Sequence, residues 1–201
     1  MKRDHLLFRM KVDCNLEEIR RGLENETARI GAYSYFTIKD PKERIICAAS
    51  FPERIIHHAV MNICEPYFER FQIFHSYACR KGKGQHAALL SAFHYAKSSP
   101  FFLKMDVRKY FDSIDHEILF NRLTRLFKDH RLLDLLSRII DSYHTAPGKG
   151  VPIGNLTSQY FANHYLASFD HYVKETLGVK RYIRYMDDML FFSSSPSDLR
   201  C

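Results

Sequence analysis

The sequence has no long apolar run of the kind that crosses a membrane. None of its segments contains about 18 consecutive apolar residues without a charge. The N-terminus begins with Lys2, Arg3 and Asp4, where a secretory signal would place an apolar core. Both absences predict a cytoplasmic protein without a membrane partner.

Paired cysteines are also missing. The five cysteines are odd in number and widely spaced, with no CxxC pair: Cys14, Cys47, Cys64, Cys79 and Cys201. A disulfide framework or a zinc site normally needs such pairs, and the eleven histidines form no HExxH pattern. We therefore expect reduced, structural thiols and no zinc.

Internal repeats and low-complexity tracts are absent, and 201 residues suffice for one domain with a buried core. Hydrophobic residues make up 46% of the chain and aromatic residues 14%, which excludes an intrinsically disordered protein. The net charge of +7 favours a polyanionic partner such as nucleic acid. Proteins that bind no nucleic acid also carry such an excess, so the charge does not identify a site.

Residue patterns predict a mixture of helices and strands. Apolar residues at helical spacing, with proline or glycine near the ends, indicate helices at 15–24, 52–64, 84–97, 115–127, 131–143 and 156–177. Short β-prone runs indicate strands at 33–38, 44–48, 101–107, 181–185 and 189–193, the first two joined by the turn Lys39-Asp40-Pro41-Lys42. The order lacks a regular βαβ rhythm, so we expect an α+β fold whose antiparallel sheet is covered by helices on one face.

Two adjacent carboxylates, Asp187 and Asp188, lie at the turn between two apolar strands. Neighbouring carboxylates repel each other unless a cation neutralises them, so the pair predicts a metal site; a solvated acidic turn is the alternative. Asp106 follows the apolar run 101–105 and can converge with this pair. Three such carboxylates suit two magnesium ions about 3.5–4 Å apart, for which Mn²⁺ can substitute, and in-line nucleotidyl transfer. The acids at 112–117 instead indicate a helix start.

Three motifs, in this order along the chain, resemble those of reverse transcriptases. Residues 104–111 (KMDVRKYF) resemble the first palm motif of that family. Residues 150–159 (GVPIGNLTSQ) resemble the motif that contacts the incoming nucleotide and the template, and residues 185–188 (YMDD) match the YxDD box. The resemblance implies an RNA-directed DNA polymerase that uses an RNA template, a DNA or RNA primer and deoxynucleoside triphosphates.

The resemblance extends from Phe36 to Phe192 and implies the fingers (1–99) and the palm (100–201) of a right-hand polymerase. Members of the family usually continue past YxDD into a helical thumb that holds the duplex, whereas this sequence ends at Cys201. We therefore expect a truncated domain that binds metal and nucleotide but extends primers poorly.

The branch of the family is indicated by smaller features. Residues 53–59 and 76–84 resemble blocks of bacterial, non-retroviral members, which implies a bacterial or phage-encoded enzyme. Ile153 and Ser158-Gln159 replace the Gln and the Ser-Pro of most members, a departure that resembles diversity-generating retroelements. Their enzymes make frequent errors at template adenines and work with a basic accessory protein. A retron or group II intron type of reverse transcriptase and a non-catalytic nucleic-acid-binding remnant stay open as alternatives.

The resemblance also implies catalytic roles for single residues. Asp106 and Asp187 would bind the metal ions, assisted by Asp188 and by the backbone carbonyl of Val107. Phe111 would be the steric gate that excludes a 2′-hydroxyl by clash, with a core phenylalanine as the alternative.

Nucleotide contacts would come from Ile153 and Gly154 and, in the fingers, from Lys39 and Arg44. Solvated charges on a hairpin are the alternative for Lys39 and Arg44, and the end of a turn is the alternative for Gly154.

Template and primer contacts would come from Tyr185 and Met186, and from a glycine-rich basic loop that contains Arg80, Lys81 and Lys83. An exposed charge run without a ligand is the alternative for this loop.

Overall fold

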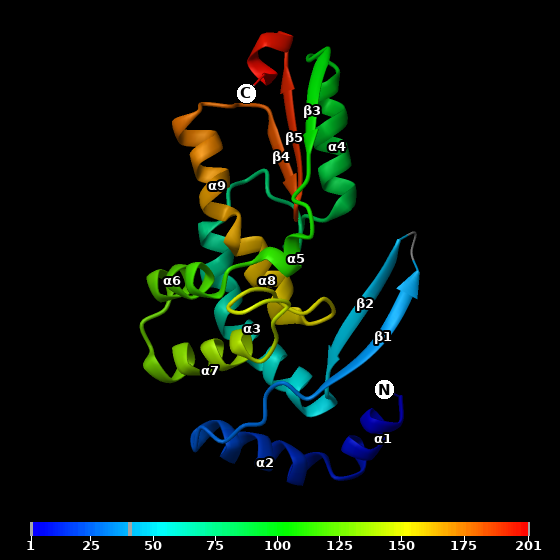
Figure 1. The fold of residues 1–201 in the computed structure, drawn as a ribbon, viewed down its shortest axis with the longest axis vertical. Coiled ribbons are helices and arrows are strands. Elements are labelled where there is room, and N and C mark those ends of the chain that lie inside the picture. Colours follow the sequence, from blue (N-terminus) through cyan, green and yellow to red (C-terminus); the bar gives the residue numbers. More distant parts are fainter. Residues whose placement is uncertain (1, 40–41, 201) are drawn as a thin grey trace. The chain divides into compact units, whose positions relative to one another are not determined.

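The computed structural model describes residues 2–39 and 42–200, and the chain divides into two compact units (Figure 1). Unit 1 comprises residues 1–65 and 111–159, and unit 2 comprises residues 66–110 and 160–201. The unit boundaries lie within three helices: α3 (Phe51–Phe71), α5 (Tyr110–Ser113) and α8 (Leu156–Tyr165). Each unit combines helices with antiparallel strands, which confirms the predicted α+β class.

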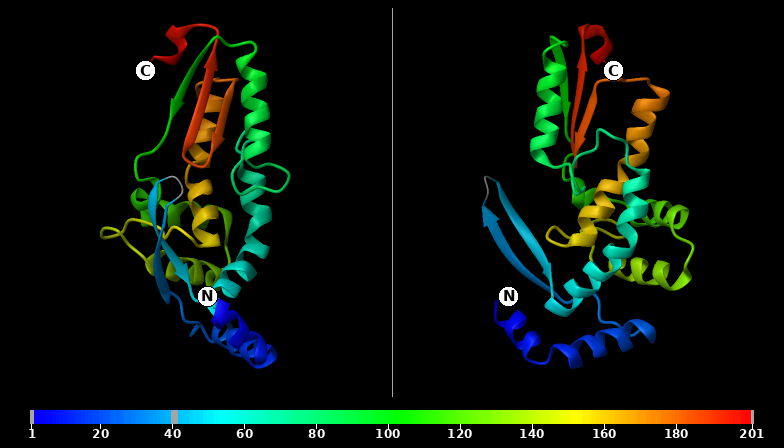
Figure 2. Two further views of the ribbon diagram at one scale, coloured as in Figure 1. Left: turned by 90° about the vertical axis from the view of Figure 1, so that its right-hand side faces the viewer. Right: turned by 180° about the vertical axis from the view of Figure 1, so that it is seen from behind.

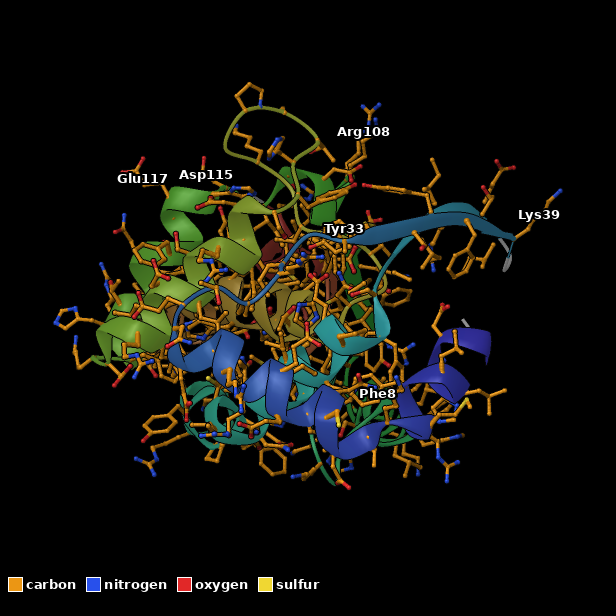
Figure 3. All side chains as sticks on the ribbon, turned by 90° about the horizontal axis from the view of Figure 1, so that it is seen from below. Phe8, Tyr33, Lys39, Arg108, Asp115 and Glu117 are labelled. Atoms are coloured by element: carbon orange, nitrogen blue, oxygen red, sulfur yellow. The ribbon has the colours of Figure 1, made fainter. Side chains whose placement is uncertain are left out.

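Unit 1 contains two N-terminal helices, a β-hairpin and a pair of helices. Their bounds are α1 Lys2–Met10, α2 Val12–Glu24, β1 Tyr33–Lys39, β2 Glu43–Ala49, α6 His116–Leu126 and α7 His130–Asp141. The side chain of Asp115 accepts the N–H of Ile118 at 3.1 Å and caps α6, where Figure 3 labels it. A carboxylate at this position accepts a hydrogen bond from a free N–H of the first turn and interacts favourably with the helix dipole. The helix start predicted from the acids of 112–117 is therefore confirmed.

The β1–β2 hairpin confirms the two strands predicted at 33–38 and 44–48. The pairing is antiparallel and continuous from Tyr33 to Lys39 of β1. Asp40 and Pro41 of the expected turn lie outside the described residues. Lys39 lies at the far end of β1 from Tyr33 (Figure 3).

Unit 2 is built around a three-stranded antiparallel sheet with the strand order β3-β5-β4. Its elements are α4 Gln85–Ala96, β3 Phe101–Met105, α9 Ala167–His171, the π-helical turn η1 Tyr172–Thr176, β4 Tyr182–Tyr185, β5 Asp188–Ser193 and the 3₁₀ turn η2 Pro196–Leu199. Figure 2 shows α4, in green, running alongside the sheet. The three predicted strands of this sheet are thus confirmed.

Both faces of this sheet are covered. Two core clusters pack on it, one of Tyr77, Ala88, Ile183 and Phe192, the other of Ile73, Val173, Tyr182 and Met189. Ala88 belongs to α4 and Val173 to η1, so helical elements lie on opposite faces. The expectation of one covered face is wrong. Successive side chains of β4 and β5 enter alternate cores, which explains why β5 contains the continuous apolar run Met189–Phe192.

The single helix predicted at 156–177 is divided into α8, α9 and η1. Near the first break, the Asn163 carbonyl accepts Arg184 Nη2 at 3.1 Å and Gln72 Nε2 at 3.4 Å. Side-chain donors at a helical carbonyl disturb the backbone ladder. In η1, the N–H of Leu177 bonds to the carbonyl of Tyr172, five residues earlier. The prediction of one helix is therefore wrong, because these contacts interrupt the regular backbone hydrogen bonds.

Helix α3 continues to Phe71, past its predicted end at Cys64. Pro66 lies inside it, although proline lacks an N–H and normally costs a helix about 3 kcal/mol. The rings of Phe68 and Phe71 each lie 5.2 Å from the ring of His164, and this packing stabilises the part of the helix that follows Pro66. In the described part of the chain, no helix combines the length and apolarity that a membrane crossing requires.

Candidate active site

The three candidate aspartates lie in unit 2, at one end of its sheet. Asp106 directly follows β3, and Asp188 is the first residue of β5. Met105 is the last residue of β3 that pairs with β5, opposite Met189. One position further along both strands, this register sets Asp106 against Asp188, and Asp187 precedes Asp188 in the β4–β5 turn. Antiparallel pairing thus brings together carboxylates that lie far apart in the sequence.

Lys104 forms an ion pair with one of these carboxylates and interacts with the charges of the other two. Its Nζ lies 2.8 Å from Asp188 Oδ1, in an ion pair whose side chains are 59% and 50% exposed. The pKa of Lys104 is raised, first by the hydrogen bond with Asp188 and then by the negative charges of Asp188, Asp106 and Asp187. All three carboxylates therefore act on one ammonium group.

The chemistry of this set fits a hard divalent cation, because it consists of carboxylate oxygens and Asp106 is followed in sequence by Val107, whose backbone carbonyl is a further oxygen ligand of the same kind. Across residues 2–39 and 42–200, no three His, Cys, Asp or Glu side chains are grouped tightly enough to hold an ion. Asp188 is instead neutralised by Lys104, so a metal ion would compete with that ammonium. The side chain of Val107 packs against a core of the sheet and anchors the backbone just after Asp106.

The β4–β5 turn that carries Asp187 has an unusual backbone. Met186 is left-handed, with a φ of +56°, a conformation that is uncommon for a residue with a side chain. Its carbonyl accepts Arg184 Nη1 at 2.9 Å. Tyr185 pairs with Asp188 across the turn and is 39% exposed. The turn therefore accepts a hydrogen bond from the side chain of a neighbouring strand residue.

In unit 1, the motif at 150–159 contacts two other predicted segments. The carbonyl of Phe111 accepts the N–H of Val151 at 2.9 Å, and the carbonyl of Ile153 accepts the N–H of Cys47 at 2.8 Å. Ile153 and Phe111 therefore belong to one connected structure that includes β2. Both side chains are half-buried, so the steric-gate role of Phe111 stays a prediction beside its core alternative.

The packing of the same loop on β2 explains why residue 154 is a glycine. Its φ is +121°, and an added Cβ would lie 2.7 Å from Ile46 Cγ2 and 3.2 Å from the Cys47 carbonyl oxygen. The next residue, Asn155, accepts the N–H of Ala49 through Oδ1 at 3.0 Å. The close approach that Gly154 permits in this structure is thus to the chain itself, and its contact with a nucleotide stays a prediction.

Lys39 and Arg44 of the hairpin are both exposed, but their register positions are adjacent rather than opposite. Adjacent positions in a pleated pair direct their side chains to opposite faces. Arg44 shares its face with Ile46, the residue against which Gly154 packs. Of the two cations, Arg44 is therefore on the face nearer the 150–159 motif.

The basic loop at 80–83 differs from its prediction. The side chain of Arg80 is 7% exposed, donates to the Glu69 carboxylate at 2.6 Å and also bonds two backbone carbonyls. Its hydrogen bond lowers the pKa of Glu69. Lys83 Nζ lies 3.3 Å from the centre of the Phe74 ring, and burial lowers its pKa. The expected flexible loop is therefore not seen at Arg80, and template contact by Arg80, Lys83 and the exposed Lys81 stays a prediction.

The sequence-based prediction missed Arg184, Asp170 and Asn163, which together support the turn. Arg184 and Asp170 are completely buried, and Asn163 is 4% exposed. One signal was present in the sequence, because Arg184 is the only charged residue between Tyr182 and Met186. A charge inside an apolar strand usually has a buried partner of opposite sign.

Several intron-encoded proteins are similar to this chain. The group II intron-encoded protein LtrA of Lactococcus lactis subsp. cremoris is 26% identical over 147 residues, which cover 69% of this chain and 24% of LtrA. An uncharacterized 91 kDa protein in a cob intron of Schizosaccharomyces pombe is 26% identical over 144 residues, 69% of this chain and 17% of that protein. Protein YkfC of Escherichia coli is 27% identical over 154 residues, which cover 70% of this chain and 40% of YkfC. The chain thus spans less than half the length of these relatives.

The fold resembles that of solved telomerases. Apo telomerase from Candida tropicalis, truncated from its C-terminal domain, matches with a TM-score of 0.59 and 14% identity over 85% of this chain and 45% of the telomerase chain. A family model for reverse transcriptase (RNA-dependent DNA polymerase) matches residues 38–201, a span that includes all three aspartates and the 150–159 motif. The chain therefore belongs to the reverse transcriptase family.

Proposed function

We propose that this chain carries the polymerising site of an RNA-directed DNA polymerase, which adds deoxynucleotides to a primer 3′-hydroxyl on an RNA template. The observation that carries the proposal is the register that sets Asp106 against Asp188, next to Asp187. The raised pKa of Lys104 supports a shared cation site, because its main cause is the hydrogen bond that Lys104 donates to Asp188 and all three carboxylates contribute.

The carboxylates of Asp106 and Asp187, assisted by Asp188 and the Val107 carbonyl, would hold two magnesium ions. When bound, such ions lower the pKa of the attacking hydroxyl and neutralise the leaving pyrophosphate; Mn²⁺ can substitute. The 3′-oxygen forms a bond to the α-phosphorus of the nucleotide while the bond from that phosphorus to pyrophosphate breaks. Lys104 would release Asp188 as the cation arrives, because both compete for the same oxygen.

The nucleotide would be oriented by residues of unit 1. Phe111 serves as the steric gate, and Ile153 and Gly154 contact the base and sugar. Arg44 and Lys39 bind the triphosphate, with Arg44 as the main contact because it shares the face of β2 that packs on the 150–159 motif. In this proposal residues 1–99 act as fingers and residues 100–201 as palm.

Tyr185, Met186 and Lys81 would contact the primer and the template. All three lie in unit 2, and Tyr185 and Lys81 are exposed. An exposed aromatic ring can stack on a base, and a lysine neutralises a phosphate without reading sequence.

We place the enzyme in a diversity-generating retroelement because of Ile153 and Ser158-Gln159. Ile153 cannot form the hydrogen bonds of a glutamine, so pairing geometry at the template is controlled less tightly. A basic accessory protein would be a partner in that case. The intron-encoded relatives favour a second candidate, a reverse transcriptase of the group II intron type. Errors concentrated opposite template adenines distinguish the first candidate from the second.

Primer extension tests the activity. A DNA primer on an RNA template is incubated with Mg²⁺, deoxynucleotides and either the wild type, Asp187→Ala/Asp188→Ala, or Asp134→Ala. Asp134 is a matched control, since it is a 54% exposed carboxylate on α7. We expect short extension products from the wild type and from Asp134→Ala, and none from the double variant.

Mn²⁺ binding, followed by electron paramagnetic resonance, is measured on the same proteins because it does not require processive synthesis. The double variant should lose the tight sites that the wild type and Asp134→Ala retain. Equal extension, or equal Mn²⁺ binding, by all three proteins would overturn the proposed function.

A further inference from the structure

A buried arginine lies directly before the catalytic turn. Arg184 is in β4, next to the exposed Tyr185, and its side chain is completely inaccessible to solvent. Burying a guanidinium costs several kcal/mol unless its charge is paired and its donors are satisfied. The neighbours of Arg184 must therefore pair its charge and accept its hydrogen bonds, since an apolar residue would fill this core position without that cost.

The charge of Arg184 is paired with Asp170, which is also completely buried. Asp170 belongs to α9, a helix that runs beside β4 (Figure 1). Arg184 Nε lies 2.7 Å from Asp170 Oδ1, and Nη2 lies 2.6 Å from Oδ2. This is a bidentate pair, which fixes the plane of the guanidinium as well as its position. The hydroxyl of Tyr182, the first residue of β4, donates a hydrogen bond of 2.7 Å to the same Oδ1.

The remaining donors of Arg184 reach the turn and α8. Nη1 donates to Asn163 Oδ1 at 2.8 Å and to the Met186 carbonyl at 2.9 Å. Nη2 also donates to the Asn163 carbonyl at 3.1 Å and to Gln72 Oε1 at 3.2 Å. An arginine has five N–H donors, and each can be matched to an acceptor here. Only the Met186 carbonyl among these acceptors belongs to the YMDD segment.

The backbone of Arg184 is fixed as firmly as its side chain. Its N–H donates to the carbonyl of His75 at 3.0 Å, and its own carbonyl accepts the N–H of Tyr77 at 3.0 Å. The guanidinium is therefore a rigid point of attachment. Met186, by contrast, has a φ of +56°, which costs a non-glycine residue about 1 kcal/mol and persists only where surrounding contacts maintain it.

We infer that Arg184, oriented by Asp170, is a positioning residue that holds the Met186–Asp187 peptide in its left-handed turn and so sets the direction of the Asp187 carboxylate. This inference rests on the proposed function, since the carboxylate matters only if it binds the catalytic cation. Lysine cannot replace Arg184, because an ammonium lacks the planar fork that binds Asp170 and Met186 together.

The test compares two variants that both weaken the Asp170 network. Arg184→Lys removes the hydrogen bond to the turn, whereas Tyr182→Phe removes a hydrogen bond to Asp170 that does not reach the turn. The free energy of unfolding and the Mn²⁺ dissociation constant are measured for each. We expect Arg184→Lys to weaken Mn²⁺ binding about tenfold, as loss of a residue that orients a metal ligand usually does, and Tyr182→Phe to leave it unchanged.

Rescue by a second substitution separates positioning from general instability. Glycine adopts a positive φ without cost, so Met186→Gly lets the turn form with less help from Arg184. Arg184→Lys/Met186→Gly should recover most of the lost Mn²⁺ affinity. Wild-type Mn²⁺ affinity in folded Arg184→Lys, or no recovery in the double variant, would overturn the inference.

Failure of the proposed function gives a different result, because the wild type and Asp106→Ala would then bind Mn²⁺ equally. A measurement on the wild type covers the case in which Arg184→Lys does not fold. The ¹⁵N order parameters of Met186 and Asp187 should equal those of Arg184, about 0.85 for a rigid backbone. A mobile turn on a rigid strand would contradict the inference.

Discussion

Lys104 and Asp188 form an ion pair between β3 and β5, with Nζ 2.8 Å from Oδ1. A divalent cation at the aspartates must displace this ammonium. We predict that Lys104→Gln tightens Mn²⁺ binding about two- to fivefold at low salt, the range expected for an exposed ion pair. Lys97→Gln, on an exposed lysine at the end of α4, is the control for net charge. The difference should shrink at high ionic strength; weaker binding by Lys104→Gln would contradict the prediction.

Gly154→Ala should destabilise unit 1 more than Gly148→Ala. Both glycines have positive φ, but a Cβ at 148 meets nothing within 4 Å, whereas one at 154 lies 2.7 Å from Ile46 Cγ2. We expect a cost of about 1 kcal/mol at 148, from backbone strain alone, and about 2–4 kcal/mol at 154, where overpacking adds to it. Urea unfolding of the two variants measures both values, and equal costs would show that the loop moves freely away from β2.

His57 should make the protein sensitive to acid. It is 1% exposed on α3, and burial lowers its pKa to about 4 from 6.5. The unfolded chain therefore binds a proton that the folded chain does not, so stability present above pH 6.5 is lost as the pH falls toward 4. Between pH 7 and pH 5 we expect a loss of about 2 kcal/mol in the free energy of unfolding.

The contribution of His57 is isolated by comparing His57→Met with His130→Met, which changes an exposed histidine at the start of α7. Glu53, with Oε1 3.6 Å from His57 Nε2, acts in the opposite sense, because burial raises its pKa. Its contribution to stability is therefore greatest in acid and falls as the pH rises above 4.5. The pH dependence should flatten in His57→Met only. An identical slope in both variants would show that burial does not lower the pKa of His57.

Arg44→Ala should raise the KM for deoxynucleotides more than Lys39→Ala. Arg44 shares a face of the hairpin with Ile46 and the 150–159 motif, whereas Lys39 points to the other face. Loss of a charge-assisted contact to phosphate, worth about 1.5 kcal/mol, predicts a KM increase of roughly tenfold for Arg44→Ala. Steady-state primer extension provides both KM values. A larger effect of Lys39→Ala would assign the triphosphate to the opposite face.

Ile153→Gln should lower the error frequency opposite template adenines. The Ile153 carbonyl is held by Cys47 at 2.8 Å, so the substitution changes the side chain without releasing the loop. A glutamine adds donors and an acceptor where isoleucine can only pack. Sequencing of extension products from the wild type, Ile153→Gln and the apolar control Ile153→Leu gives the spectra. The hypothesis fails if all three spectra agree.

Local sequence patterns determined most of the elements and the candidate aspartates. The strand propensity of the hairpin and the cap at Asp115 each depend on residues within a few positions of one another. Steric preferences and hydrogen bonds over such short distances are encoded in the local sequence. For the same reason YMDD, flanked by two apolar strands, could be placed at a turn without any knowledge of the fold.

Tertiary structure alone decided the features that depend on contacts between residues far apart in the sequence. The Arg184–Asp170 pair joins β4 to α9, within the segment that the sequence predicts as one uninterrupted helix. The side chain of Arg80 is paired with Glu69 rather than left in a flexible loop. The continuation of α3 past Pro66 depends on the packing of Phe68 and Phe71 on His164. A buried charge or an interrupted helix is stable only when its partner is in place, and the partner's position is set by the folded chain.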